Sequence, residues 1–159
     1  MGGIDVLINN AGYSYRAEIG SIDMEQMRRM FDVNFFGLVD ITNRVVPLMK
    51  QQGEGDIVNI ASTSGMKGGV GGTAYGGSKW AVRGITQSWQ AELRPHSIRV
   101  MCVCPSEVQT NFDGKTGRNN PNKLFADDIA ASIMAALDMP RRALWPEWAI
   151  FATNPWKEG

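Results

Sequence analysis

Short apolar runs alternate with longer mixed stretches along this chain. Strand-like runs occupy residues 4–8 (IDVLI), 57–61 (IVNIA), 98–104 (IRVMCVC) and 148–152 (WAIFA). The first three runs are apolar almost throughout, which is typical of strands that are buried on both faces of a parallel sheet. We therefore expect three buried strands, and the fourth run is a further strand candidate near the end of the chain.

The stretches between these runs predict helices. Asp23 can cap a helix that continues through MEQMRRMF to Lys50, either without interruption or with a break. Residues 73–93 predict a second helix, and residues 126–137 a third with acidic side chains in its first turn, where they favour the helix dipole. Because strands and helices alternate, the pattern predicts an α/β protein with a parallel sheet covered by helices.

The length of the chain bounds its organisation. With 159 residues the chain can bury one substantial core, so we expect a single domain over residues 1–159. In open parallel sheets, ligands bind beyond the carboxyl ends of the strands. NNAG at 9–12, Ser62 and PSEVQT at 105–110 each follow a predicted strand, so their side chains should gather at one edge of the sheet.

Charge and composition exclude several classes of partner. Lys plus Arg and Asp plus Glu are 16 each, which leaves no bulk charge to attract nucleic acid or anionic lipid. No apolar run approaches the roughly 18 residues of a membrane span, and the N-terminus lacks the pattern of a signal peptide. Cys102 and Cys104 are expected as two buried free thiols rather than as a disulfide or a metal site. We therefore expect a cytoplasmic protein with no metal, no nucleic-acid partner and no membrane partner.

The candidate chemistry centres on a tyrosine and a lysine in the second predicted helix. Tyr75 and Lys79 stand four residues apart, so they share one helix face. A fixed ammonium favours the phenolate, and lowering the phenol pKa from about 10 to about 7 would take roughly 4 kcal/mol. Ser62 could hold a carbonyl or alcohol oxygen for the proton transfer. The three residues predict oxidation of an alcohol or reduction of a carbonyl, although the pair alone also fits an ordinary helix face.

Further motifs accompany this pair and point to a known family. Five of them occur in the family's order, namely NNAG (9–12), VNFFG (33–37), IVNIAS ending in Ser62, YGGSK (75–79) and PSEVQT (105–110). On these motifs the chain resembles the short-chain dehydrogenase/reductase family from its first residues to its last strand. The resemblance implies a Rossmann-like, doubly wound parallel sheet and NAD(P)-dependent interconversion of an alcohol and a ketone or aldehyde by hydride transfer.

The resemblance also implies a role for each matching residue. Tyr75 would be the acid/base, Lys79 would lower its pKa and hold the nicotinamide ribose, Ser62 would orient the substrate oxygen, and Asn34 would anchor a water in the proton relay. The other implied positions all contact the cofactor: Asn10, Ala11 and Gly12 at the adenosine ribose, and Pro105, Val108 and Thr110 at the nicotinamide end.

Simpler interpretations of these residues stay open. Asn34 could satisfy backbone groups inside a kinked helix, and Thr110 could only cap a local turn. Ser62 could be a turn hydroxyl, with Ser64 as the rival for its role. The glycine-rich run at 64–71 also formally matches the TGxxxGxG pyrophosphate turn, and part of it resembles a phosphate-binding loop. We favour the interpretation that these glycines let the chain turn tightly beside the substrate.

Two departures from the family pattern bear on function. Ser106 stands where the family has a glycine after Pro105, which could reposition the loop under the nicotinamide. No TGxxxGxG turn precedes NNAG at 9–12, and that part of the family carries the choice between NAD and NADP. The chain is therefore interpreted as a truncated, C-terminal catalytic part of the fold, of about four parallel strands with flanking helices, whose cofactor is NAD or NADP.

A different class of function stays open beside the enzyme. The chain could be a non-catalytic fragment that folds or oligomerises without binding a dinucleotide. If no further strand flanks residues 4–8, that strand has unpaired backbone groups and invites pairing with a second copy. In the family, the helices that hold Asn34 and Tyr75 form subunit contacts, so the resemblance implies a homo-oligomer beside a small alcohol or carbonyl substrate.

Overall fold

The computed structural model describes residues 2–112 and 120–156. Its centre is a four-stranded sheet in the order β1-β2-β3-β4, in which all neighbouring strands are parallel. The strands are β1 (Val6–Asn9), β2 (Gly55–Ile60), β3 (Ile98–Pro105) and β4 (Glu147–Ile150). The predicted α/β sheet of about four parallel strands is confirmed, and the ends of β2, β3 and β4 differ from the prediction by one or two residues.

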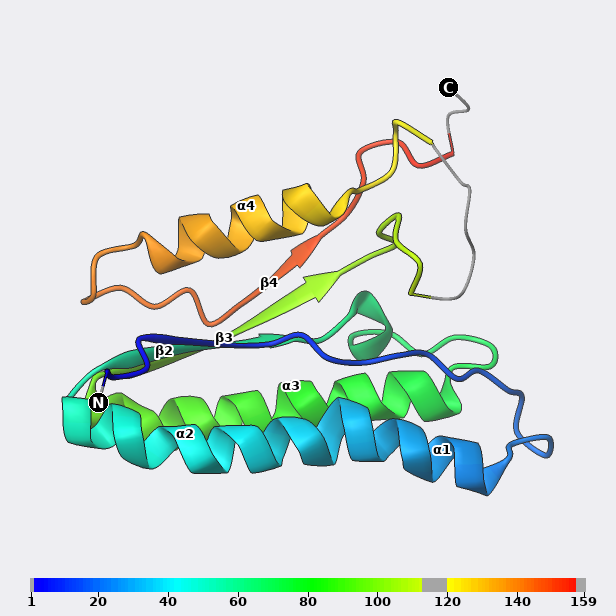
Figure 1. The fold of residues 1–159 in the computed structure, drawn as a ribbon. Helices are drawn as coiled ribbons and strands as arrows, with labels where there is room; N and C mark the ends of the chain where they lie inside the picture. The colour runs from blue at the N-terminus through cyan, green and yellow to red at the C-terminus, as the bar shows by residue number, and fades with distance from the viewer. Residues whose placement is uncertain (1, 113–119, 157–159) are drawn as a thin grey trace.

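Helices cover both faces of this sheet (Figure 1). On one face lie α1 (Met24–Phe31), the π-helical turn η1 (Asp32–Gly37), α2 (Leu38–Gln52) and α3 (Thr73–Leu93). On the other face lies α4 (Ala126–Leu137). This arrangement is the doubly wound, Rossmann-like architecture expected from the sequence, and the helices at 73–93 and 126–137 have the predicted bounds.

The predicted long first helix runs without interruption and changes to a π-helical segment in its middle. Asp23 caps α1, since its Oδ1 accepts the backbone N–H groups of Glu25 at 2.8 Å and Gln26 at 3.2 Å. The π-helical turn η1 then joins α1 to α2, and α2 ends at Gly53 with a φ of 86°. Glycine adopts this left-handed conformation without strain, so it stops the helix just before β2 begins.

The prediction that residues 4–8 form a strand buried on both faces is wrong. The strand runs over Val6–Asn9, and the side chains of Val6 and Ile8 are 41% and 46% exposed. Among the described strands β1 pairs with β2 alone, and the core under α4 is built on β2, β3 and β4. The face of β1 that carries Val6 and Ile8 is therefore uncovered, while Leu7 packs on the opposite face.

The core lies on both sides of β3, in which every residue is buried. Because successive side chains of a strand point to opposite faces, β3 supplies both layers. Met101 and Val103 pack under α4, whereas Cys102 and Cys104 pack toward α3. The layer under α4 also contains Val58, Ile133, Ala136 and Trp148.

An ionic network joins the amino ends of the strands to the segment between α4 and β4. Arg99 donates from Nε and Nη2 to the two carboxylate oxygens of Asp56 at 2.6 and 2.9 Å. Arg141 donates to both oxygens of the same carboxylate at 2.8 Å. Arg99 also donates to the backbone carbonyls of Leu137 and Met139, so the network fixes the end of α4 against the sheet.

Two short 3-10 turns complete the described elements. One is η2 (Thr63–Gly65), which follows β2, and the other is η3 (Arg94–His96), which follows α3. Within the described part of the chain, no helix combines the length and the apolar character needed to cross a membrane.

Candidate active site

A cleft of about 1270 Å³ opens beyond the carboxyl ends of the strands. Its walls come from the segments that follow β1, β2 and β3, from the start of α3 and from α4. Parallel strands end at a common edge, so residues far apart in the sequence meet there. The predicted site residues that line the cleft are Asn10, Ala11, Gly12, Ser62, Tyr75, Lys79, Pro105, Val108 and Thr110.

Tyr75 lies in the first turn of α3 and is 6% exposed. The Lys79 Nζ lies 5.9 Å from the centroid of its ring, as the spacing of four residues on a helix predicts. The ring of Phe112 meets it edge-on with centroids 5.8 Å apart, and the guanidinium carbon of Arg16 lies 5.2 Å from its centroid. The phenol is thus held between two cationic groups and an apolar ring.

Lys79 is an ammonium buried at the floor of the cleft, where it is 4% exposed. Its Nζ donates to the backbone carbonyl of Ile60 at 2.8 Å. Burial lowers the pKa of Lys79 from 10.5 to about 8, although the nearby thiols of Cys102 and Cys104 oppose this shift. The charged form still predominates at neutral pH, and deprotonation needs only a modest rise in pH.

Ser62 ends the segment after β2 and starts the turn η2. Its Oγ accepts the backbone N–H of Ser64 at 3.1 Å, so it is a turn hydroxyl as the simpler interpretation proposed. A serine hydroxyl retains one donor and a second lone pair after one such bond. Ser62 therefore can also bind a ligand oxygen in the cleft, and Ser64 lines the same cleft as its rival.

Asn34 does not line the cleft. It is 1% exposed in η1, where its Nδ2 donates to the Tyr13 carbonyl at 2.9 Å and its Oδ1 accepts the Tyr13 N–H at 3.0 Å. Nδ2 also lies 3.2 Å from the Ser78 Oγ. Asn34 thus satisfies backbone groups of the segment after β1 and ties that segment to the helical layer.

Gly12 of the segment after β1 lies beside Asn34 and Lys79. A Cβ added there would lie 3.0 Å from the Asn34 Oδ1 and 3.7 Å from the Lys79 Nζ. The first distance is shorter than a normal carbon–oxygen contact, so a side chain would displace the amide. Glycine therefore keeps open the space beside the Lys79 ammonium.

The segment after β3 forms the third wall. The N–H of Ser106 donates to the Ile150 carbonyl at 2.9 Å, and Val108 forms a parallel bridge with Leu124. The Thr110 Oγ1 accepts the Phe112 N–H at 3.3 Å, so the local-turn interpretation of Thr110 is also observed. Both Val108 and Thr110 still face the cleft.

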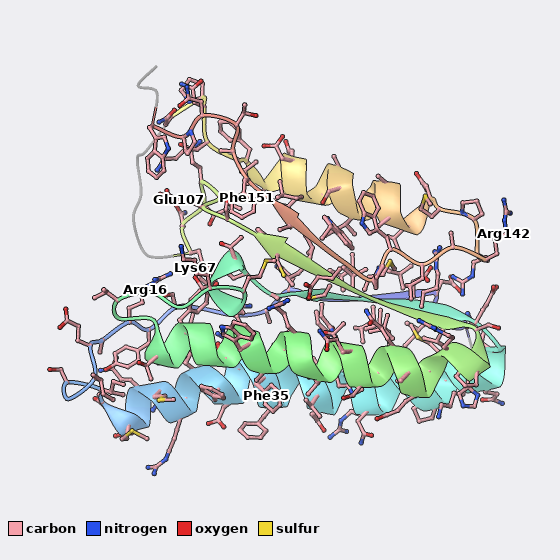
Figure 2. All side chains as sticks on the ribbon, turned by 180° about the vertical axis from the view of Figure 1, so that it is seen from behind. Arg16, Phe35, Lys67, Glu107, Arg142 and Phe151 are labelled. Atoms are coloured by element: carbon pink, nitrogen blue, oxygen red, sulfur yellow. The ribbon has the colours of Figure 1, made fainter. Side chains whose placement is uncertain are left out.

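Several cleft residues were not identified from the sequence. They include Arg16, Phe112, Ile129 of α4, and Lys123, which pairs with Glu107 of the PSEVQT motif at 2.7 Å. Arg16 and Glu107 lie at the end of the molecule where the strands terminate (Figure 2). Arg16 follows NNAG by four residues, and this position is the sequence feature that could have identified it as a cleft residue. In contrast, the glycine-rich loop at 66–72 does not line the cleft.

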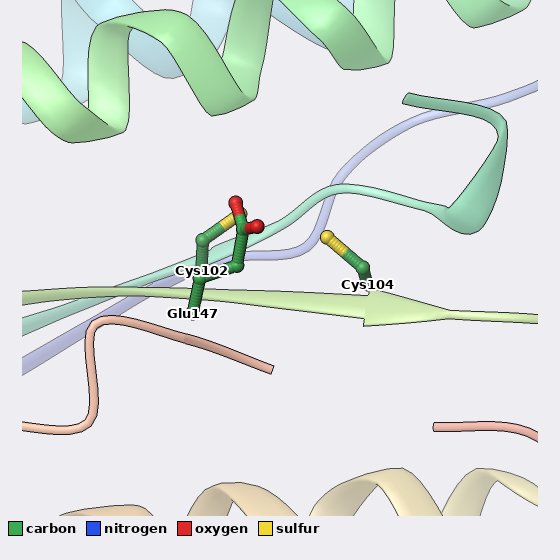
Figure 3. Close-up of side chains that lie close together, drawn as sticks. All are labelled: Cys102, Cys104 and Glu147. Carbon is green, nitrogen blue, oxygen red and sulfur yellow. The ribbon is translucent and has the colours of Figure 1, made fainter. Parts of the chain in front are cut away.

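A second cluster lies behind the cleft, between β3 and α3 (Figure 3). The Sγ atoms of Cys102 and Cys104 and a carboxylate oxygen of Glu147 lie within 4.8 Å of one another. Both cysteines are free and buried, as predicted. Arg83 donates to the two oxygens of Glu147 at 2.8 and 2.7 Å, so this carboxylate is already engaged by a guanidinium.

The two thiols differ in acidity. A hydrogen bond to Cys104 together with burial raises the pKa of Cys102, while the hydrogen bond from Cys102 lowers the pKa of Cys104. The Arg83 guanidinium and the backbone N–H of Ser62 also favour the Cys104 thiolate. Cys104 is therefore the more acidic thiol of the pair.

Comparison with known proteins places the chain in a family. A sequence model described as short chain dehydrogenase matches residues 1–121. An uncharacterized oxidoreductase of Staphylococcus saprophyticus is 39% identical over 139 residues, which are 87% of this chain and 59% of the relative. The chain belongs to the short-chain dehydrogenase family, and it spans about three fifths of the length of this curated relative.

Solved structures have the same fold. The chain is similar to a closed form of serine dehydrogenase complexed with NADP+, with a TM-score of 0.86, 28% identity, and coverage of 93% of this chain and 64% of that one. It is also similar to an alcohol dehydrogenase from the archaeon Thermococcus sibiricus complexed with 5-hydroxy-NADP. There the TM-score is 0.88 and the identity 25%, and the match covers 99% of this chain and 67% of that one.

Proposed function

We propose that the cleft is the reaction site of an NAD(P)-dependent oxidoreductase that interconverts an alcohol and a ketone or aldehyde. The observation that carries the proposal is the convergence of Ser62, Tyr75 and Lys79 on one cleft, from the end of β2 and the first turns of α3. A hydroxyl, a phenol and an ammonium at one site can bind a carbonyl oxygen and exchange a proton with it. The family of the chain is that of dehydrogenases, which supports this chemistry.

In the proposed reduction, the Tyr75 hydroxyl donates its proton to the substrate oxygen while Ser62 donates a hydrogen bond to the same oxygen. The resulting phenolate is stabilised by the Lys79 ammonium, whose Nζ lies 5.9 Å from the centre of the ring. In the oxidation, Tyr75 accepts the proton from the alcohol. Phe112 packs on the phenol and limits the access of water to it on that side.

The residues of the cleft fit a nicotinamide dinucleotide. Lys79 has three N–H donors and uses one for the Ile60 carbonyl, so it can donate to ribose hydroxyls in the space that Gly12 leaves open. When bound, the nicotinamide supplies or accepts the hydride. The residues that would hold the rest of the cofactor are Asn10, Ala11, Pro105, Val108 and Thr110. Two similar structures contain NADP+ or a derivative of it, which supports such a cofactor in the form of NAD or NADP.

Self-association is a further part of the proposal. The layer formed by η1, α2 and α3 carries large apolar side chains that are between 41% and 57% exposed, namely Val33, Phe36, Ile41, Leu48 and Trp80. Large exposed apolar side chains on neighbouring elements are frequent at subunit contacts. They support a homo-oligomer that uses the helices of Asn34 and Tyr75. The free thiols Cys102 and Cys104 are compatible with the proposed cytoplasmic location.

One observation favours the alternative, a non-catalytic fragment that binds other subunits and no dinucleotide. Within the described sheet, β1 is an edge strand that pairs with β2 on one side, and such an edge can pair with a second copy. The enzyme is preferred because an edge for pairing does not account for a phenol, an ammonium and a hydroxyl in one cleft.

Replacement of Tyr75 tests the proposed function. Formation of NADH or NADPH is followed with a panel of small secondary alcohols, for the chain and for Tyr75→Phe. Loss of the phenol proton should lower kcat by about 10³-fold, within the usual range for a general acid/base. Tyr13→Phe is the matched control, because the Tyr13 side chain does not line the cleft. A Tyr75→Phe variant with activity within about tenfold of the parent would refute the assignment.

A further inference from the structure

Arg16 places a guanidinium in the cleft that the proposed reaction does not use. The side chain is exposed, lines the cleft and stacks on Tyr75, with its guanidinium carbon 5.2 Å from the centre of the ring. Figure 2 shows Arg16 at the end of the molecule where the strands terminate. A cation over an aromatic face is attracted by the ring, and this contact positions the guanidinium beside the reacting phenol.

Some of the charged side chains that line the cleft have a partner of opposite charge, and others do not. Glu107 and Lys123 neutralise each other at 2.7 Å, and Lys79 donates to the Ile60 carbonyl. Within residues 2–112 and 120–156, no carboxylate lies within ion-pair distance of Arg16. The Arg16 guanidinium therefore retains donors for an anion that enters the cleft.

We propose that Arg16 binds the carboxylate of the substrate, so that the substrates are small hydroxy acids and the corresponding oxo acids. This inference rests on the proposed function of the cleft. The planar guanidinium presents paired N–H donors that match the two oxygens of a carboxylate. Because Arg16 and the proton-transferring phenol are in contact, the carboxylate and the reacting oxygen belong to one small molecule. Phe112, on the same ring, provides an apolar contact for its carbon chain.

A first experiment measures binding at Arg16 without any need for turnover. The chain is labelled with phenylglyoxal, and the modification of each arginine is followed by peptide mass spectrometry. The additions are 2-hydroxybutyrate, 3-hydroxybutyrate and 4-hydroxypentanoate, each beside its neutral amide. At least one acid should slow the labelling of Arg16 by about tenfold, and its amide should not. Arg94, which is exposed at the other end of α3, is the internal control and should react equally in every sample.

A second experiment measures selectivity in turnover. The ratio of kcat/KM for the acid to kcat/KM for its amide is compared between the parent chain, Arg16→Gln and Arg16→Lys. Removal of a charged hydrogen-bonding partner should lower this ratio by about 10- to 100-fold in Arg16→Gln. Arg16→Lys should lose less, because it keeps the charge and loses only the paired donors. Arg94→Gln makes the same chemical change away from the cleft and should leave the ratio unchanged.

The outcomes separate this inference from the proposed function. Turnover of acids and amides with equal efficiency, unaffected by Arg16→Gln, would overturn the role of Arg16 and leave the oxidoreductase standing. Protection of Arg16 by an acid without turnover of any substrate would support the carboxylate site and count against the proposed reaction. Equal labelling of Arg16 with every acid and amide would overturn the inference whatever the turnover.

Discussion

Lys79 of α3 donates a hydrogen bond from its Nζ to the backbone carbonyl of Ile60 in β2, over 2.8 Å. This contact holds an ammonium that is 4% exposed at the point where β2 ends and the cleft begins. A charge in such a position loses hydration that one carbonyl does not replace, so its presence opposes folding. The ammonium is thus retained at a cost to stability, which agrees with the role proposed for Lys79 in the cleft.

This cost predicts a dependence of stability on pH. The pKa of Lys79 is about 8 in the folded chain, against 10.5 for an ordinary lysine. Between these values the unfolded chain binds more protons, so the contribution of Lys79 becomes more favourable to folding as pH rises from about 8 to 10.5. Below pH 8 the unfavourable contribution is complete, and it amounts to about 3 kcal/mol.

Lys79→Met removes this titration. The free energy of unfolding of the variant minus that of the parent should fall by about 2 kcal/mol between pH 7 and pH 9.5. Urea denaturation at the two pH values gives this difference. The lost hydrogen bond to Ile60 changes the stability of the variant by the same amount at both pH values, so it cancels. Lys50→Met is the control, since Lys50 is exposed on α2 and no buried ammonium is removed. A difference that is the same at both pH values would show that folding does not lower the pKa of Lys79.

Gly12 gives a test of cofactor binding that does not depend on catalysis. A Cβ at this position would lie 3.0 Å from the Asn34 Oδ1 and would occupy space beside Lys79. Gly12→Ala should therefore weaken the binding of NADH or NADPH by at least about tenfold, as expected for overpacking at a close contact. Titration followed by tryptophan fluorescence measures the dissociation constants.

The matched control is Gly68→Ala, since a Cβ at Gly68 would meet nothing within 4 Å. It should leave cofactor affinity unchanged. The same titration distinguishes the two functions considered for this chain. Micromolar binding by the parent would exclude the non-catalytic fragment, whereas no binding at millimolar cofactor would favour it over the enzyme.

Asp56 should be a main determinant of stability outside the cleft. It is 7% exposed and accepts hydrogen bonds from Arg99 and Arg141. Removal of its charge would leave these two guanidinium groups without their anion. Asp56→Asn should lower the free energy of unfolding by about 3 kcal/mol, as expected for breaking a buried ion pair. Asp40→Asn, which removes the partner of Arg44 on the exposed surface of α2, should have little effect. Urea denaturation of both variants checks this, and similar stabilities would contradict the structural role of the network.

Part of the cleft could be predicted from the sequence, because several of its residues directly follow strands. Asn10, Ser62 and Pro105 each follow a strand, and parallel strands bring their carboxyl ends to one edge. The spacing of Tyr75 and Lys79 was sufficient to predict that they share one helix face, because a helix has a regular repeat. Regular elements thus account for the successful part of the prediction.

The remaining features depend on tertiary packing that no local pattern encodes. Ile8 belongs to an apolar run, but its exposure depends on which elements lie over β1 and not on the run itself. Arg16 and Phe112 lie in segments without periodicity, so their contact with Tyr75 follows from the path of two loops. The pairing of Asn34 with the backbone of Tyr13 likewise depends on a loop, and the sequence suggested only that the asparagine would be bonded.

The thiols behind the cleft give a last prediction, which concerns selective reactivity. Cys102 and Cys104 are both 0% exposed, so iodoacetamide should label both slowly, and Cys104 should be the faster of the two at pH 7, because the hydrogen bond from Cys102 lowers its pKa and a thiolate is the reactive form. Cys102→Ala removes that donor and should slow the alkylation of Cys104, whereas Cys102→Ser keeps a hydroxyl donor and should preserve much of it. Iodoacetamide labelling with peptide mass spectrometry gives both rates in one sample. Labelling of Cys102 at an equal or higher rate would contradict the lowered pKa of Cys104.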